Sequence, residues 1–127
     1  MNNTFEKWEI SKNLPNDLSF WKMEVNNNQL LIFLNNLIDE TEVFVIKFEY
    51  FASFKVSIDL VLMKTVDEIL SFRGFARTKS SNYLNSIVEG SYNVISKNQL
   101  EHFVIYNLDN AIEVISDLPG ELTSIKL

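Results

Sequence analysis

The sequence predicts an α+β fold, mostly antiparallel β-sheet built from a meander and a C-terminal hairpin, with one or two short helices. Three observations predict it. Apolar and polar residues alternate through residues 29–62 in segments joined by short connections, as in antiparallel strands. Helical spacing is confined to two short stretches between residues 65 and 90. Alternation returns over residues 101–116, on both sides of an asparagine-containing turn.

The N-terminal segment predicts two elements separated by a turn. Leu14-Pro15-Asn16-Asp17 interrupts residues 5–25, because proline and the Asx side chains favour turns. We expect a strand or short helix before this interruption and a strand over about residues 18–25 after it. Three consecutive asparagines at residues 26–28 predict the next turn, since asparagine tolerates positive φ.

Three strands are predicted next, at residues 29–35, 42–51 and 54–62. The first is apolar on both faces, so we expect both to be covered, whereas the other two each carry one polar face. β-branched and aromatic residues dominate the second strand, which suits a half-buried pleated surface. Because the connections are short, we expect these strands to form one antiparallel meander.

Two short helices are predicted after the meander. Residues 65–68 have the form of a capping box that begins at Thr65, and Gly74 could close the helix that follows. An irregular strand is the alternative for this stretch. Ser81 could cap a second helix that ends at Gly90, because the apolar residues between them follow helical spacing.

The C-terminal segment predicts a hairpin and an edge strand. Residues 101–106 and 111–116 form the two arms, with residues 107–110 as the turn. Residues 121–127 follow a second turn as the final edge strand. The chain has 127 residues and shows no internal repeat or linker, so we expect a single domain over residues 1–127.

Composition excludes several kinds of catalytic and metal site. Cysteine is absent, which excludes disulfides and thiolate chemistry. His102 is the only histidine, so one chain cannot form a multi-histidine metal site. The three glycines are far apart, which excludes a phosphate-binding glycine loop. No serine lies in a Gly-x-Ser-x-Gly motif, so we expect His102 to be structural. We expect no enzymatic activity, no cofactor and no metal.

The net charge of the chain indicates which kinds of partner to expect. The formal net charge is −6, which makes nucleic acid a poor partner, and only the short Phe72–Lys79 stretch mixes bases with aromatics. A basic protein is the expected partner; the alternative is that acidity only keeps the chain soluble. The longest apolar run, Leu30–Leu34, is too short to span a membrane, and the N-terminus lacks an apolar signal core. We therefore expect a cytoplasmic protein without a membrane partner.

The C-terminal hairpin carries most of the candidate partner-binding residues. Its acidic residues are Glu101, Asp109, Glu113 and Asp117. No lysine or arginine follows Glu101 until Lys126. Alternate residues of a strand share a face, so these acids could form a fringe that presents charge to a cationic protein. The alternative is that they keep sheet edges from pairing with other chains.

Trp21 is the aromatic candidate for the same role. Tryptophan is enriched at the positions of protein interfaces that contribute most of the binding energy. The alternative is packing in the core, where aromatic side chains supply much of the buried area.

Two parts of the chain carry a resemblance to known proteins. They comprise Phe20-Trp21-Lys22-Met23, residues 28–34 and 45–49, and then residues 82–84, 102–106 and 112–119. Over about two-thirds of its length the chain resembles small uncharacterised bacterial β-rich proteins of the immunity-protein type. The resemblance includes no catalytic motif. It implies a non-enzymatic cytosolic protein.

Three functions are therefore open. The first is a non-enzymatic protein-binding domain, in its specific form a cytosolic immunity protein that neutralises a toxin. The second is a self-associating structural domain in which strand edges pair with another copy, giving a homo-oligomer. The third is a small-molecule binder that uses carboxylates.

Overall fold

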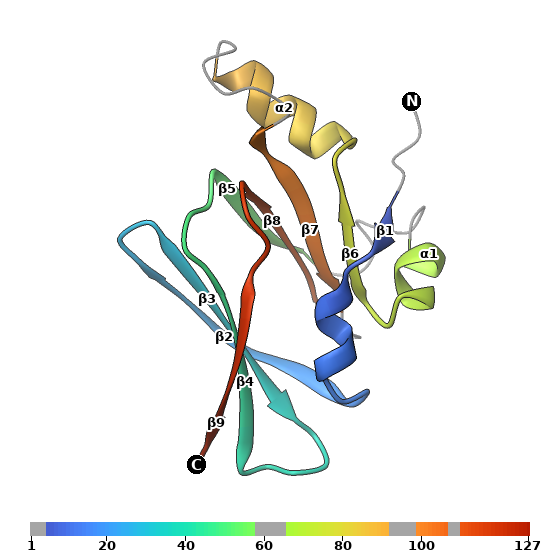
Figure 1. Ribbon diagram of the computed structural model, residues 1–127, viewed down its shortest axis with the longest axis vertical. Coiled ribbons are helices and arrows are strands. Elements are labelled where there is room, and N and C mark those ends of the chain that lie inside the picture. The colour runs from blue at the N-terminus through green and yellow to red at the C-terminus, as the bar shows by residue number, and fades with distance from the viewer. Residues whose placement is uncertain (1–4, 58–65, 92–98, 107–109) are drawn as a thin grey trace.

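The computed structural model of the chain describes residues 5–57, 66–91, 99–106 and 110–127. These residues form two antiparallel β-sheets that face one another, together with short helices (Figure 1). The expectation of a mostly antiparallel sheet is confirmed, whereas the α+β class fits only loosely because the helices are few and short. Among the described helices, none is long and apolar enough to cross a membrane.

The first sheet contains the predicted meander. β2 (Leu18–Asn26), β3 (Gln29–Asn36) and β4 (Glu42–Phe48) pair in sequence order, and β9 (Glu121–Lys126) pairs with β4. Asn27 lies in the turn between β2 and β3 with a φ of 58°, which confirms the asparagine turn. The final edge strand is confirmed as well, because β9 lies at one edge of this sheet.

The second sheet collects five strands from distant parts of the chain. Its order is β1 (Glu6–Lys7), β6 (Phe75–Thr78), β7 (Glu101–Tyr106), β8 (Ala111–Ser116) and β5 (Ser53–Ser57). β7 and β8 pair as the two arms of the predicted hairpin. Residues 107–109 of its predicted turn lie outside the described residues.

One strand of the predicted meander belongs to the other sheet. The expected strand over residues 54–62 corresponds to β5, which pairs with β8 rather than with β4; residues 58–62 lie outside the described part of the chain. The expectation of one continuous meander is therefore wrong at this point. Alternation shows which side chains face the core, but a strand with the same alternation can approach that core from either sheet.

The chain crosses between the sheets directly after β4, which ends three residues earlier than predicted. The amide of Ala52 donates a hydrogen bond to the carbonyl of Ile115 in β8. The hydroxyl of Ser116 donates to the carbonyl of Tyr50. These two bonds hold the crossing segment against the second sheet, and they leave Tyr50 partly exposed instead of on the buried face of a longer strand.

The first predicted helix is confirmed as a helix and not an irregular strand. α1 (Val66–Ser71) is followed by Gly74, which has a φ of 85° and donates its amide to the carbonyl of Ile69. Thr65, its predicted cap, lies outside the described residues. β6 begins directly after Gly74, and this strand was not predicted because four residues are too few to establish a period.

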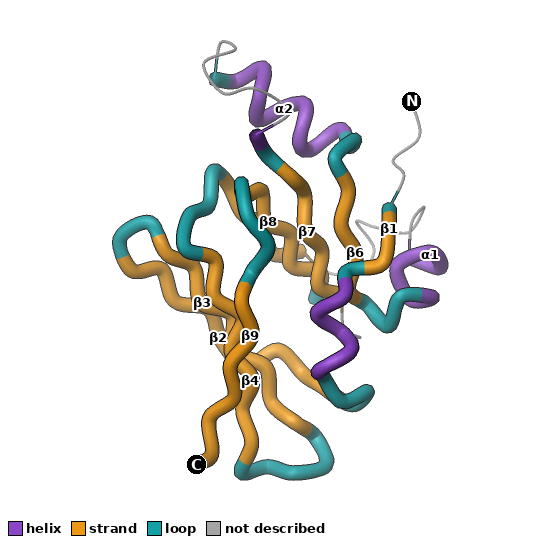
Figure 2. Tube along the Cα trace, viewed as in Figure 1, coloured by secondary structure: helices purple, strands orange, loops and turns teal. Residues whose placement is uncertain are grey.

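The second predicted helix begins and ends where expected. In α2 (Asn82–Gly90), the hydroxyl of Ser81 accepts a hydrogen bond from the amide of Leu84, as an N-cap does. Gly90 is the last helical residue, and Ser91 is the C-cap. Figure 2 shows α1 and α2 beside the five-stranded sheet.

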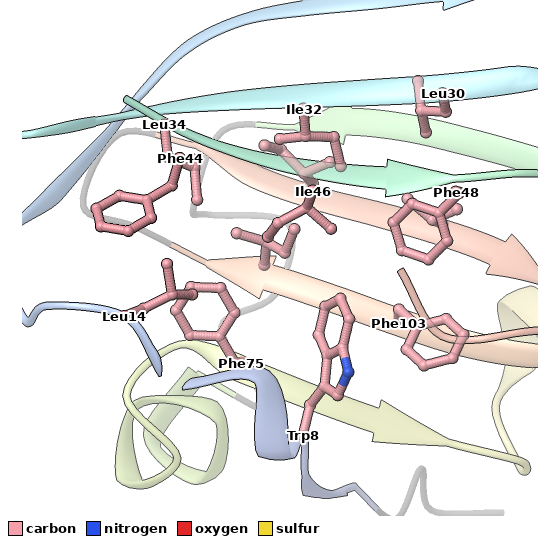
Figure 3. Close-up of a cluster of buried hydrophobic side chains, with 13 residues drawn as sticks. Trp8, Leu14, Leu30, Ile32, Leu34, Phe44, Ile46, Phe48, Phe75 and Phe103 are labelled. Carbon is pink, nitrogen blue, oxygen red and sulfur yellow. The ribbon is translucent and has the colours of Figure 1, made fainter. Parts of the chain in front are cut away.

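The main apolar core lies between the two sheets (Figure 3). Trp8 stands within it, with its ring centroid 5.0 Å from that of Phe103 in one sheet and 6.1 Å from that of Phe48 in the other. Trp8 precedes the 3-10 helix η1 (Glu9–Asn13), and Leu14 after this helix packs into the same core. The N-terminal segment thus supplies both a short strand and a short helix.

The helices cover the other face of the five-stranded sheet. Ile69 of α1 packs with Val104 of β7. Leu84 of α2 packs with Leu100 and with Ile115 of β8. This sheet is therefore apolar on both faces, and all six residues of β7 and of β8 are buried.

Candidate functional site

The outer face of the four-stranded sheet is the first candidate site, because none of the described helices covers it. The register places the side chains of alternate residues on this face. We call it the open face and define it by Trp21, Lys22, Leu31, Phe33, Val43, Val45, Thr123 and Ile125. Val43 and Val45 are already buried by their neighbours on this face. Leu31 and Phe33 are half-buried, so the expectation that both faces of their strand are covered is met only in part on this side.

Trp21 projects from an irregularity in the edge strand β2. The pairing of β2 with β3 shifts by one residue between Phe20 and Lys22, which leaves Trp21 as the extra residue of a β-bulge. Its side chain is 46% exposed. The ring lies edge-on to Phe33 with a centroid separation of 5.7 Å. Trp21 is therefore a surface residue on the open face and does not pack in the core.

Lys22 fixes the orientation of these two rings. Its Nζ lies 4.5 Å from the ring centroid of Trp21 and 4.7 Å from that of Phe33, which is cation–π distance for both. The same Nζ forms an ion pair of 2.9 Å with Glu24. An aromatic pair held in this way loses little conformational freedom when a partner binds.

Ion pairs border the open face. Lys47 pairs with Glu49, and the hydrogen bond that its ammonium group donates to this carboxylate is the main reason that the pKa of Lys47 is raised. Lys126 pairs with both Asp39 and Glu42, but Lys126 and Glu42 alternate with Ile125 and Val43 of the open face, so this ion pair lies on the other side of the sheet. With the Lys22–Glu24 pair, each of the two lysines at the border of the open face meets a carboxylate, so this border has no excess of positive charge.

A buried polar cluster beneath α2 is the second candidate site. At its centre is His102, whose Nδ1 lies 2.8 Å from the hydroxyl of Ser81 and whose Nε2 lies 2.9 Å from Oε1 of Glu113. The neutral imidazole with its proton on Nε2 satisfies both contacts, because Ser81 donates to Nδ1 while Nε2 donates to Glu113. Ser81 also accepts from the amide of Leu84, so every atom in this chain of contacts has a partner.

Lys55 and Tyr83 complete the cluster on its solvent side. Nζ of Lys55 lies 3.5 Å from Oε2 of Glu113 and 4.3 Å from the ring centroid of Tyr83. Oε2 of Glu113 has no hydrogen bond, so the lysine charge is its main compensation. The hydroxyl of Tyr83 forms a 2.6 Å hydrogen bond with Ser53, and burial raises the pKa of this phenol.

The cluster contains a serine, a histidine and a carboxylate, yet its geometry suits a structural role. Catalytic triads bind the serine through Nε2 and the carboxylate through Nδ1, and here the two nitrogens are exchanged. Ser81 is buried and is engaged as the cap of α2, so its hydroxyl faces protein atoms instead of a substrate. These hydrogen bonds hold the start of α2 against β7 and β8.

Two of the four acids expected to form a fringe on the hairpin are buried. Glu113 is 2% exposed within the cluster just described, and Glu101 is 7% exposed. Glu101 binds Arg77 of β6 through both carboxylate oxygens, and this hydrogen bonding raises the pKa of Arg77. The expectation that Glu101 and Glu113 present charge at the surface is thus wrong, because each is paired with a cation from a strand distant in sequence, Arg77 on β6 and Lys55 on β5.

The remaining predicted residues lie apart from one another. Asp117 is exposed in the segment between β8 and β9. Asp109 lies outside the described residues. Trp21 lies on the other sheet. Among the four predicted residues that the structure describes, no two meet in one surface site.

The described residues contain no group of three or more His, Cys, Asp or Glu side chains that could hold a metal ion. Comparisons with known proteins add no assignment: no family model, no curated protein and no solved structure matches the chain. The resemblance to immunity proteins therefore stays a prediction.

Proposed function

We propose that the chain is a non-enzymatic domain that binds another protein, and that the open face is where the partner docks. The observation that carries this proposal is the half-exposed Trp21, fixed against Phe33 by Lys22 on a sheet face that the described helices leave uncovered. Rigid, partly exposed aromatic side chains are typical anchors of protein interfaces. The resemblance to immunity proteins makes toxin neutralisation in the cytoplasm the specific version.

Charge supports a basic partner. The chain carries a net charge of −6, and the lysines that border the open face are already matched by carboxylates. An acidic partner would therefore meet no free cation at this border, whereas a basic partner would be attracted from a distance. Contacts with the apolar centre of the open face would supply affinity, and the charged residues at its border would speed association.

The test compares two substitutions of exposed apolar residues in a native pull-down at low salt. Trp21→Ala removes the anchor, and Leu118→Ala is the control because Leu118 is exposed in the segment between β8 and β9 and is not one of the residues that define the open face. We expect one stoichiometric basic partner to be retained by the unmodified chain and by Leu118→Ala. Trp21→Ala should bind it at least ~10-fold more weakly, as an interface anchor does. Higher salt should also release it.

Two results would contradict the proposal. One is equal retention of the partner by Trp21→Ala and Leu118→Ala, which would place binding elsewhere on the molecule. The other is an unmodified chain that retains nothing from a lysate known to contain the products of neighbouring genes. Circular dichroism of both variants checks that each is folded.

Self-association is a second candidate function, and the edge strand β5 favours it. Within the described residues β5 pairs only with β8, and Phe54 and Val56 on it are exposed. A free edge of this kind can pair with another copy. Light scattering over a range of concentrations separates the two candidates: a dimer that survives Trp21→Ala and is lost in Val56→Glu would support edge pairing, and a monomer at all concentrations would exclude it.

A further inference from the structure

A cavity of about 330 Å³ opens at one end of the space between the two sheets. Its inner wall is made by Leu34 of β3, Phe75 of β6 and Ile105 of β7, all of them buried core residues. Leu37 and Leu70 form its rim and are partly exposed to solvent. Pockets that bind small molecules are typically about 300–1,000 Å³ and mostly apolar, so this cavity has the size and lining of a small one.

The side chain of Arg73 lines the same cavity and is held in place by two carbonyl groups. Its Nη1 donates to the carbonyl of Ser11 at 2.9 Å and its Nη2 to that of Leu14 at 2.7 Å. A guanidinium has five N–H donors, so three remain beyond these two bonds. Among the described residues, no carboxylate lies within ion-pair distance of Arg73.

Arg73 is exposed to solvent and has no ion-pair partner among the described residues, and its positive charge beside an apolar cavity is complementary to an amphipathic anion. Asp17 lines the cavity as well, and its negative charge disfavours a ligand with a second anionic group. We infer that this cavity binds a small amphipathic monocarboxylate, with its apolar tail between the sheets and its carboxylate at Arg73. This inference is independent of the open face, which is formed by the opposite side of the four-stranded sheet.

The volume limits the length of the tail. A water molecule occupies about 30 Å³ of the liquid, so the cavity corresponds to roughly ten waters. Octanoate is a suitable probe of this size, and octan-1-ol is the matched neutral probe because it has the same tail. Titration calorimetry measures the affinity of both, and amide chemical shifts in a ¹⁵N-labelled chain locate the site.

We expect octanoate to bind saturably and to shift the amides of cavity-lining residues such as Leu37 and Leu70, but not that of Leu118. Octan-1-ol should bind about 10- to 100-fold more weakly, which is the usual effect of a hydrogen bond to a charged group. Leu37→Asp should weaken octanoate binding by at least ~10-fold, because it places a second carboxylate at the rim. Leu118→Asp is the control, since Leu37 and Leu118 are similarly exposed, at 59% and 62%.

Arg73→Gln tests the charge directly, and Arg73→Lys should restore part of the lost affinity. Because Arg73 also holds two carbonyl groups, a thermal melt must show that each Arg73 variant is folded. If one of them is not folded, the comparison of Leu37→Asp with Leu118→Asp still decides the test. The inference is overturned if neither probe binds saturably, if octan-1-ol binds as tightly as octanoate, or if Leu37→Asp and Leu118→Asp bind octanoate equally.

Discussion

At the scale of single residues, His102 shows how a buried polar side chain is tolerated. Its ring is hydrogen-bonded at both nitrogens, and the edges of Phe5 and Tyr83 pack against it with centroid separations of 5.5 and 5.2 Å. A buried polar group costs free energy unless it is paired, and here Ser81 and Glu113 provide the pairing. Glu113 in turn depends on His102 and on Lys55, so these residues form one energetic unit.

We predict that His102→Leu destabilises the fold by about 3–5 kcal/mol, because it leaves the buried Glu113 carboxylate with only the lysine contact. The double variant His102→Leu/Glu113→Leu should lose at least ~1 kcal/mol less than the sum of the two single variants, since no unpaired carboxylate remains. Urea unfolding of the four chains measures the coupling. Additive losses would show that His102 and Glu113 act independently.

At the scale of elements, the turn between α1 and β6 depends on one glycine. Gly74 has a φ of 85°, and a Cβ atom added there would lie 2.1 Å from the carbonyl oxygen of Tyr106. That carbonyl belongs to the backbone of β7, so it cannot move aside as a flexible side chain would. The same glycine accepts a 2.7 Å hydrogen bond from the amide of Tyr106, which joins the end of α1 to the sheet.

Gly74→Ala should therefore be strongly destabilising, and Gly90→Ala is its matched control. The positive φ at Gly74 alone costs about 1–3 kcal/mol for a residue with a side chain, and the contact with Tyr106 adds to this. At Gly90, the last residue of α2, an added Cβ meets nothing within 4 Å. Alanine there should be neutral or stabilise by up to ~1 kcal/mol. Thermal unfolding of both variants checks the difference, and similar melting temperatures would refute it.

At the scale of the whole molecule, the two sheets share one core around Trp8. This side chain contacts Phe48 of one sheet and Phe75 and Phe103 of the other. The crossing segments before β5 and before β9 also hold the two sheets together. In the segment before β9, Gly120 packs closely on Ile46: a Cβ atom added at Gly120 would lie 2.6 Å from Cγ2 of Ile46. Neither sheet can therefore bury its inner face alone.

The two sheets should unfold together. In a Trp21→Phe variant, Trp8 is the only tryptophan, and because it is buried its emission should be blue-shifted and resistant to acrylamide quenching. Its fluorescence and the far-ultraviolet circular dichroism should then change at the same urea concentration, as two-state unfolding requires. Separate midpoints would show that one sheet survives without the other.

The sequence indicated local structure well wherever periodicity or a cap was present. The alternation in β3 and β4, the asparagine turn at Asn27 and the Ser81 cap of α2 were all predicted, because each depends on residues close together in the chain. The strand β6 was not, because its four residues gain their structure from pairing with β7. Of the five predicted site residues, Trp21 and Asp117 are exposed as expected among those that the structure describes.

What the sequence by itself determined is thus the antiparallel, β-rich class, the start of α2 and the lack of a multi-histidine or thiolate site, since these follow from composition and short-range patterns. What only the tertiary structure decided is which sheet each strand joins and which charges are buried. Glu113 meets Lys55 from 58 positions away, and His102 on the neighbouring strand meets Ser81 from 21 positions away. Partners so distant along the chain leave no local pattern, because strand pairing and sheet packing, which bring them together, are set by the energy of the whole core.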